Sequence, residues 1–236
     1  MFWIESPRDV VQLTGPDAAS YLQSQLSQDL RPLQVGQSTW SFVLQPTGKV
    51  DVLLRVWRTA DETFVLDTDA GFGDAMVARL NRFKIRVKAD IAPLDWRCIS
   101  VRGASAPVDA ADAVVAWGDG FDLLGPAPMP PDGVPQGTSD DMLAARIDAA
   151  WPTMGAEIEP GETIPAETGV IDVAVSFTKG CYPGQELVER MDSRAVTAPK
   201  LLQRLSTADA QRLGARVTST AGDVVLAYVP RSALQS

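Results

Sequence analysis

The clearest pattern in the chain is an alternation of hydrophobic and polar residues on both sides of a short turn. Every second residue from Trp40 to Leu44 is hydrophobic, and so is every second residue from Val50 to Val56. The residues between them, Pro-Thr-Gly-Lys at 46–49, are typical of a turn. Because a period of two places alternate side chains on opposite faces of a sheet, this stretch predicts a β-hairpin.

The residues around this hairpin predict helices and further strands. Ala18, Leu22 and Leu26 share one face of a helix that Pro16 would begin, since proline suits the first helical position. A second helix is expected at residues 76–83, and further strands at 9–13, 64–67 and 85–91. Strands with helices between and after them indicate an α+β layer, and we assign it to a first domain of residues 1–93.

The second half of the chain has weaker patterns of the same kinds. We expect strands at residues 96–101, 114–117, 121–124 and 173–177, and a helix at 140–147 that Ser139 would cap. These form a second α+β domain, residues 94–195. Short strands at 201–205, 216–219 and 224–229 form a final β domain, residues 196–236. At about 40 residues, this last domain is too small to hold a core of its own.

Composition and charge exclude several classes of protein. With 45% hydrophobic residues the chain is ordinary for a folded protein, and no apolar run reaches the roughly 18 residues that cross a membrane. The first residues, Met-Phe-Trp-Ile-Glu, lack the basic and long apolar parts of a signal peptide, so a cytoplasmic protein is expected. The net charge of −9 argues against a general nucleic-acid binder, which needs clustered lysines and arginines.

One cluster of positive residues stands out against this acidic background: Arg79, Arg82, Lys84, Arg86 and Lys88. From Lys84 onward the charges alternate with Ile85, Val87 and Ala89, so on a strand they would share one face. Two interpretations stay open, a solvated strand face and a docking surface for an anionic ligand or partner.

The chain has no histidine and only two cysteines, Cys98 and Cys181. Without histidine, neither a Cys-His nor a Ser-His catalytic pair can form, and zinc sites that use histidine are excluded. Two thiols cannot supply a four-cysteine zinc or iron–sulfur site, so we expect no self-contained metal site. Cys98 lies in an expected strand and is interpreted as a small core residue, and both thiols are expected to be reduced.

The second cysteine stands in the motif Lys-Gly-Cys-Tyr-Pro-Gly-Gln-Glu, residues 179–186. Pro183 suits the first position of a helix, so Cys181 would lie just outside a helix N-terminus, where unpaired backbone N–H groups favour an anion. Together with the charge of Lys179, this position would favour the thiolate. Spacing alone leaves two alternatives open: a cysteine buried in a tight strand-to-helix turn, or a thiol presented for function.

The same motif resembles the signature K-G-C-Y-x-G-Q-E of the YgfZ-type folate-binding proteins, which are relatives of the glycine-cleavage T-protein, an aminomethyltransferase. The matching residues are Lys179, Gly180, Cys181, Tyr182, Gly184, Gln185 and Glu186. Segments 13–30, 48–56, 145–152 and 164–169 are similar to further parts of the family, in the order that the family requires. The resemblance covers most of residues 9–195 and, more weakly, the final strands.

This resemblance implies both a fold and a ligand. The fold is α+β, with two mixed domains and a small, shortened C-terminal β-barrel around a central cavity that admits tetrahydrofolate. Asp148 holds the position of a family carboxylate that faces the pterin, whose amino group and ring N–H a single carboxylate can accept together. The further folate contacts implied are Arg146 as a positioning charge, Glu167 as a wall of the cavity, and Lys179, Tyr182 and Gln185 of the motif.

Departures from the family argue against the T-protein's own reaction. The T-protein hairpin carries a pair of acids, one of which assists aminomethyl transfer, whereas here Asp51 is followed by Val52. Ala150 replaces a family glycine, and the C-terminal region is short for a full barrel. Because a missing acid of this kind costs about 10²–10⁴ in rate, aminomethyl transfer is not expected.

The function implied is that of an accessory protein for the maturation or repair of iron–sulfur proteins, with bound tetrahydrofolate and Cys181 as the functional thiol. Its partners would be iron–sulfur enzymes or assembly proteins rather than nucleic acid or a membrane, and a monomer is expected. Two alternatives stay open. One is a folate-dependent one-carbon transferase, and the other is a folate-binding or interaction module in which Cys181 only packs.

Overall fold

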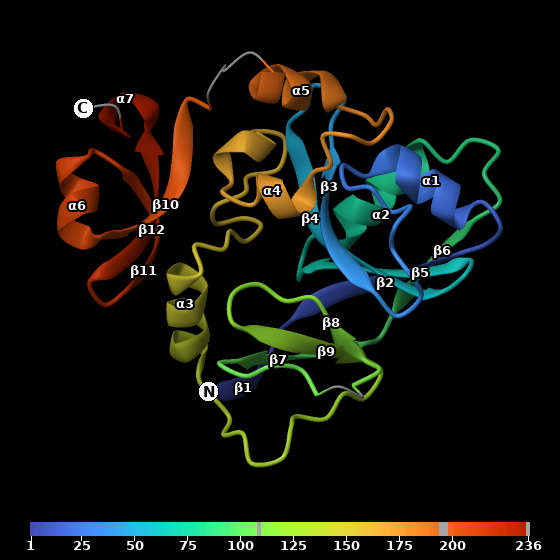
Figure 1. Cartoon of the computed structure of the whole chain (residues 1–236), viewed down its shortest axis with the longest axis horizontal. Helices are drawn as coiled ribbons and strands as arrows, with labels where there is room; N and C mark the ends of the chain where they lie inside the picture. Colours follow the sequence, from blue (N-terminus) through green and yellow to red (C-terminus); the bar gives the residue numbers. More distant parts are fainter. Residues whose placement is uncertain (108–109, 194–197, 235–236) are drawn as a thin grey trace.

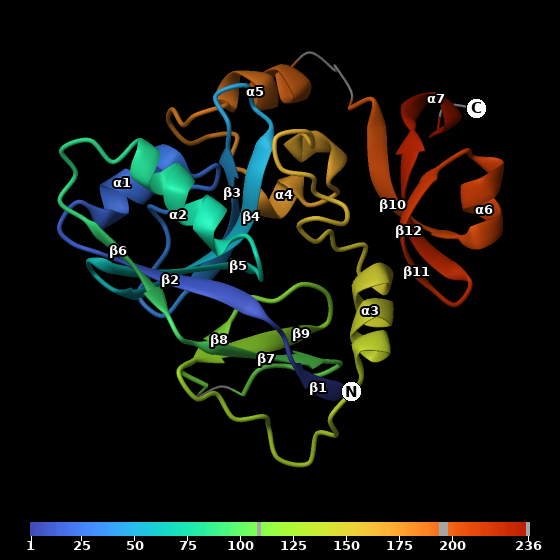
Figure 2. The same cartoon turned by 180° about the vertical axis from the view of Figure 1, so that it is seen from behind.

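The computed structural model describes residues 1–107, 110–193 and 198–234. Its strands form three antiparallel sheets, with helices beside and between them (Figures 1 and 2). The α+β class expected from the sequence is therefore confirmed. Within the described ranges, no helix is long and apolar enough to cross a membrane.

The first sheet has five strands in the order β3-β4-β5-β2-β6. They are β2 (Arg8–Thr14), β3 (Ser38–Leu44), β4 (Val50–Ala60), β5 (Thr63–Asp69) and β6 (Asp90–Leu94). The expected hairpin is formed by β3 and β4. Two helices, α1 (Ala18–Gln25) and α2 (Gly73–Arg82), pack on this sheet, because their apolar faces share one hydrophobic core with its strands.

The second sheet has four strands in the order β1-β7-β9-β8. They are β1 (Phe2–Glu5), β7 (Arg97–Arg102), β8 (Ala113–Val114) and β9 (Gly120–Gly125). Strand β1 comes first in the chain but pairs with β7, so the N-terminal residues belong to the second sheet. Helix α3 (Ser139–Asp148) follows. Its N-cap is Thr138 and not the expected Ser139, because Thr138 and Asp141 form a reciprocal capping box.

The third sheet has three strands in the order β10-β12-β11, namely β10 (Lys200–Ser206), β11 (Arg216–Ala221) and β12 (Val224–Pro230). Helices α6 (Thr207–Arg212) and α7 (Arg231–Leu234) accompany it. Leu202, Leu226 and Tyr228 of this sheet share a core with Ile147 of α3, which supplies the apolar contact that so short a segment lacks. The expected small barrel is not shown, since the described residues here form a sheet of three strands.

The division of the chain into three domains stays a prediction. The expected boundary at residue 93 falls inside β6, and the one at residue 195 lies outside the described residues. Strand β1 pairs with β7 across the first of these boundaries.

The strand expected at residues 173–177 is wrong. The short helix α4 (Ile171–Ala174) occupies the start of this segment. Val170 and Ala174 are buried at helical spacing, whereas Val173 and Phe177 are exposed. The alternation in the sequence therefore does not correspond to a buried face of a sheet.

The strand expected at residues 85–91 is wrong over most of its length. Residues 83–89 form a loop, and β6 begins only at Asp90. Val87 packs against the first core, but Ile85 is exposed and Arg86 has a left-handed backbone with φ of 58°. Because strand residues have negative φ, extended structure cannot continue through Arg86.

A network of buried charges joins the first two sheets. The fully buried Arg55 of β4 donates to Asp67 of β5 and to Asp122 of β9, each at 2.8 Å. Asp122 also accepts from Arg102 of β7 at 2.8 Å. Removing one partner of an ion pair buried this deeply costs about 3–5 kcal/mol, so the network ties β4 and β5 to β9.

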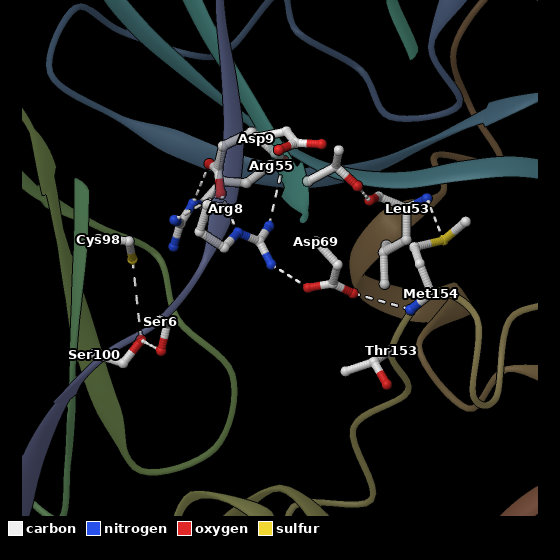
Figure 3. Close-up of polar contacts among 12 residues, drawn as sticks. Ser6, Arg8, Asp9, Leu53, Arg55, Asp69, Cys98, Ser100, Thr153 and Met154 are labelled. Carbon is white, nitrogen blue, oxygen red and sulfur yellow. Dashed lines mark hydrogen bonds and ion pairs between the residues drawn. The ribbon is translucent and has the colours of Figure 1, made fainter. Parts of the chain in front are cut away.

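The same network reaches the segment that follows α3 (Figure 3). Arg8 of β2 pairs with Asp67 at 2.7 Å and with Asp69. The second carboxylate oxygen of Asp69 accepts from the backbone N–H of Met154 at 2.9 Å. The position of the residues after α3 is thus fixed from the first sheet.

Candidate functional site

Cys181 lies in the loop between α4 and α5 (Gln185–Ser193), and its side chain is exposed. The alternative of a cysteine buried in a tight turn is therefore wrong for this residue. Helix α5 begins at Gln185, which is two residues after the expected Pro183. Since the effect of a helix dipole falls off within one turn, its influence at Cys181 is smaller than the sequence suggested.

Lys179 anchors the loop on one side of the cysteine. Its side chain is buried, and its ammonium donates to the backbone oxygens of Gln23 (2.7 Å), Leu26 (2.6 Å) and Gln28 (2.9 Å) at the end of α1. Burial lowers the pKa of Lys179 to about 8. An ammonium has three N–H donors, and all three are used here. Lys179 therefore has no donor left for Cys181 or for a folate.

Tyr182 and Gln185 fix the loop on the other side. Tyr182 is buried in a hydrophobic core that it shares with residues of β3 and β4, and this burial raises the pKa of its hydroxyl to about 12. The side-chain oxygen of Gln185 accepts from the backbone N–H of Tyr182 at 3.2 Å, and its amide donates to Glu189. Both residues thus hold the turn in shape, and their expected contact with folate stays a prediction.

Two glycines interlock this loop with the tip of the β3–β4 hairpin. Gly48 and Gly184 have positive φ values of 86° and 85°. A Cβ atom on Gly184 would lie 2.5 Å from the backbone oxygen of Gln45, and one on Gly48 would collide with Leu187 of α5. Because only glycine tolerates both the conformation and the contact, the motif and the hairpin depend on each other for their positions.

The two residues between these anchors are left open to solvent. Cys181 is exposed, and a Cβ atom placed on Gly180 would have no neighbour within 4 Å. The thiol is therefore presented on a turn whose flanking residues are held in place. Cys98 is the opposite case, since it is buried in β7 and burial raises the pKa of its thiol to about 12.

Arg146 lies in a buried polar cluster between α3 and the third sheet. It donates to Glu157 (2.8 Å), to the backbone oxygen of Trp151 (2.9 Å) and to Ser219 of β11 (2.6 Å). Glu157 is itself almost fully buried and also accepts from Ser219 at 2.6 Å. These contacts attach α3 to the third sheet. Whether Arg146 also positions folate stays a prediction.

Glu167 ends the 3-10 turn η1 (Pro165–Glu167) and is buried. Its nearest cation is Lys200 of β10, at 3.7 Å. Burial raises the pKa of Glu167, and Lys200 offsets this rise only in part. The contact links η1 to the third sheet, and the expected role of Glu167 as a cavity wall stays a prediction.

Asp148 lies at the exposed C-terminal end of α3 and pairs with Arg204 of β10 at 2.8 Å. It lines a cavity of about 370 Å³ between α3, the start of β1 and the turn at residues 117–119. Cys181 is not among the lining residues of this cavity. Helix α3 and the loop before α5 also lie in separate parts of the molecule (Figures 1 and 2).

Asp51, the single acid of the hairpin, is already paired. Arg79 of α2 lies 3.2 Å from it, and the amide of Gln45 donates to it at 2.8 Å. The guanidinium of Arg79 also donates to the backbone oxygen of Leu44 at 2.7 Å. This carboxylate therefore has a structural role next to the turn of the β3–β4 hairpin.

Comparison with known proteins bears on the family. No protein-family model matches the chain. It is 28% identical over 196 residues to an uncharacterised protein of Haemophilus influenzae, which covers 78% of the chain and 66% of that protein. It is 27% identical over 228 residues to the mouse mitochondrial iron-sulfur cluster assembly factor IBA57, covering 82% and 63% of the two chains. It is also 27% identical over 223 residues to the tRNA-modifying protein YgfZ of Vibrio vulnificus, covering 84% and 67%.

The chain is a relative of the YgfZ and IBA57 proteins. The resemblance predicted from the cysteine motif is thus confirmed. The matched region spans 63–67% of the lengths of these three relatives, about two thirds or less.

A solved structure supports the fold of this YgfZ/IBA57 relative. The glycine cleavage system aminomethyltransferase T from Bartonella henselae superposes with a TM-score of 0.70 and 18% identity, covering 98% of this chain and 78% of that one. At this identity the likeness establishes the three-sheet fold and leaves the chemistry open.

Several residues that shape the site carried no clear signal in the sequence. Glu157 and Ser219, the partners of Arg146, lie 11 and 73 residues further along the chain. The partners of Lys179 are backbone oxygens, which no side-chain pattern marks. Gly48 was a recognisable turn residue, but its contact with α5 depends on tertiary packing.

Proposed function

We propose that this protein is an accessory factor for iron–sulfur proteins that acts through the thiol of Cys181. The observation that carries the proposal is the exposure of Cys181 on a turn held by Lys179 on one side and by Tyr182 and Gly184 on the other. Relatives named as an iron-sulfur cluster assembly factor and as a tRNA-modifying protein support an assignment of this kind.

The chemistry available to this thiol is limited and specific. A thiolate can hold iron transiently, carry a persulfide, or exchange with a disulfide. The described residues contain no group of three or more potential metal ligands, so any metal at Cys181 would have to bring its other ligands from a partner or a small thiol. The proposed role is therefore one of transfer between partners.

A complementation experiment tests this role. Cys181→Ser is expected to abolish support of an iron–sulfur enzyme in cells that lack their own YgfZ-type protein, because serine cannot form the sulfur bonds required. Cys98→Ser is the matched control, since Cys98 is buried and its thiol is hardly ionised. Full support by Cys181→Ser would reject the proposal, provided that both variants are folded and equally abundant.

We propose further that the protein binds tetrahydrofolate at Asp148. In support, Asp148 is exposed at a cavity of about 370 Å³, and sites for small molecules usually measure about 300–1,000 Å³. One carboxylate can accept two parallel hydrogen bonds from the pterin, for which it would exchange its exposed ion pair with Arg204. The central cavity between the domains that the family resemblance implies is a separate part of the proposal, because the cavity at Asp148 is lined by residues of the second sheet, the turn at 117–119 and α3.

Calorimetric titration with tetrahydrofolate tests the binding. Asp148→Ala is expected to weaken binding at least tenfold, because about 1.5–3 kcal/mol is lost with hydrogen bonds to a charged group. Asp172→Ala, which removes an exposed acid of α4, is the control and is expected to bind normally. Equal affinity of the two variants would place folate elsewhere, and no heat with the wild type would reject folate as a ligand.

A folate-dependent one-carbon transferase is the second candidate, and the likeness to an aminomethyltransferase fold is what favours it. Against it, Asp51 is already engaged by Arg79 and Gln45. Transfer of a one-carbon unit from a methylene donor to tetrahydrofolate by the purified protein would support this candidate. No turnover, together with tetrahydrofolate binding, would leave the accessory role.

A further inference from the structure

The loop of residues 83–89, with Arg82 at the end of α2, has a surface chemistry that the proposed function does not use. Residues 82–88 contain four cations and no acid, in a chain whose net charge is −9. Among them, Arg82, Arg86 and Lys88 are exposed. Ile85 lies between these charges and is 76% exposed, so an aliphatic side chain stands in water within a cationic patch.

Contacts on both sides hold this loop in place. Val87 packs against the core of the first sheet, and Ala89 beside it is buried. The ammonium of Lys84 donates to the backbone oxygen of Ala89 at 2.6 Å, and the backbone N–H of Lys88 donates to the carboxylate of Asp17 at 2.7 Å. The exposure of Ile85 is therefore a property of an anchored loop.

The conformation of Arg86 produces this exposure. Its φ of 58° lies in the left-handed region, which residues other than glycine rarely adopt. The chain reverses its side-chain alternation at this point, so that Val87 reaches the core while Ile85 does not. Strain of this kind persists only where the surrounding structure enforces it, and it gathers at functional segments.

We propose that this loop docks the protein onto an anionic lipid surface. Ile85 would enter the boundary between head groups and acyl chains, and Arg82, Arg86 and Lys88 would lie against lipid phosphates. An aliphatic side chain gains free energy when it leaves water for hydrocarbon, and each nearby cation adds attraction to an anionic leaflet. A protruding loop needs no matching pocket on a fluid surface.

Two observations favour a lipid surface over a nucleic acid. Single-stranded nucleic acids are bound largely by stacking of bases on aromatic rings. The ring of Phe83 already has the guanidinium groups of Arg79 and Arg82 over it, at 4.2 Å and 5.8 Å from its centroid. Ile85, the most exposed hydrophobic residue of the patch, offers nothing to stack on.

The overall negative charge does not prevent this docking. At physiological ionic strength, charges more than about 8 Å from the surface are largely screened, so only the charges next to the membrane matter. The proposal departs from the expectation that a membrane is not a partner. It concerns the docking of one loop and not a membrane span, for which the described residues contain no suitable helix.

Co-sedimentation of the full chain with lipid vesicles tests the proposal. Binding is expected to vesicles of phosphatidylcholine and phosphatidylglycerol in equal parts, and not to vesicles of phosphatidylcholine alone. Ile85→Ser is expected to weaken binding about tenfold through the lost apolar burial. The double variant Arg86→Asn, Lys88→Gln is expected to weaken it about fivefold per charge, and asparagine suits the left-handed conformation of residue 86.

Met129→Ser is the matched control, because Met129 is also 76% exposed but lies in the loop at residues 126–137. It is expected to bind as the wild type does. Absence of binding to the anionic vesicles at low salt would overturn the proposal, and so would an equal loss from Ile85→Ser and Met129→Ser. Binding of a short single-stranded RNA without binding of vesicles would overturn it in favour of a nucleic acid.

Discussion

Replacing Lys179 with methionine tests how the cysteine turn is held. Methionine keeps the length and apolar stem of lysine but removes the ammonium that donates to the oxygens of Gln23, Leu26 and Gln28. The buried carbonyl group of Leu26 and the partly buried ones of Gln23 and Gln28 then lose this partner. A hydrogen bond from a charged group is worth about 1.5–3 kcal/mol, and an unsatisfied buried acceptor costs about 1–3 kcal/mol.

The sum of these terms overstates the loss, because burial of the ammonium is itself unfavourable. Burial lowers the pKa of Lys179 from 10.5 to about 8, and a shift of this size corresponds to roughly 3 kcal/mol of cost for the charged form. Methionine removes that cost together with the hydrogen bonds. Three such hydrogen bonds are worth about 4.5–9 kcal/mol, so after this cost the expected net loss in the free energy of unfolding is about 1.5–6 kcal/mol at pH 7.

Urea unfolding followed by tryptophan fluorescence measures this loss. Lys49→Met is the matched control, since Lys49 forms only an exposed ion pair with Glu162 at 3.1 Å. Such pairs contribute about 0–1 kcal/mol, so a loss below this limit is expected for the control. A loss no larger for Lys179→Met than for Lys49→Met would show that the three hydrogen bonds do not anchor the turn.

Three further outcomes follow from the same contacts. In the native protein, iodoacetamide should label Cys181 and leave Cys98 unreactive until the protein unfolds. The reason is that burial raises the pKa of the Cys98 thiol from 9.0 to about 12, which lowers its thiolate fraction about a thousandfold. Mass spectrometry measures the labelling, and two labels on the native protein would contradict the prediction. Gly184→Ala should lower the free energy of unfolding by about 3 kcal/mol, because its Cβ would collide with the backbone oxygen of Gln45. Gly36 has nearly the same φ but no close neighbour, so Gly36→Ala should lower it by only about 1 kcal/mol. Equal losses would mean that the contact with Gln45 is unimportant. The pKa of Glu167 is raised in the native state, so the native protein keeps this proton to a higher pH than the unfolded chain does. The free energy of unfolding should therefore fall as pH rises from 4.5 through the native pKa. Urea titrations at a series of pH values measure this slope, and Glu167→Gln should flatten it.

The parts of the fold that could be predicted are those whose residues carry their own periodic pattern. The β3–β4 hairpin has a period of two on both strands and a turn between them, and it forms as expected. Helix α3 was placed to within one residue, because its charged first turn and its cap lie close together in the sequence. Local chemistry decides these elements, and local chemistry is visible in a sequence.

The failures have a different origin. The alternation at 173–177 is real in the sequence, but Val173 and Phe177 face solvent in the fold. Strand β1 was missed because only its pairing with β7, almost a hundred residues later, makes it a strand. Burial and pairing between distant segments decide such cases, and a single sequence does not contain them.

In the candidate site, too, the features set by neighbouring residues could be predicted, and those set by distant segments could not. The cysteine motif was recognised from eight consecutive residues, and the exposure of Cys181 agrees with a presented thiol. The partners of Lys179 could not be predicted, because its three backbone acceptors lie about 150 residues earlier in the chain, and its expected contact with folate stays a prediction. A charge near a cysteine in sequence says little about where its donors point in space.

The motif itself separates residues that the fold requires from residues that it does not. Lys179, Tyr182, Gly184 and Gln185 each have a partner or a conformation that accounts for their identity. Gly180 has no such reason, since it is absent from the glycines with positive φ and would have no neighbour for a Cβ within 4 Å. Under the proposed function, glycine at position 180 would leave room for a partner to approach the exposed sulfur of Cys181.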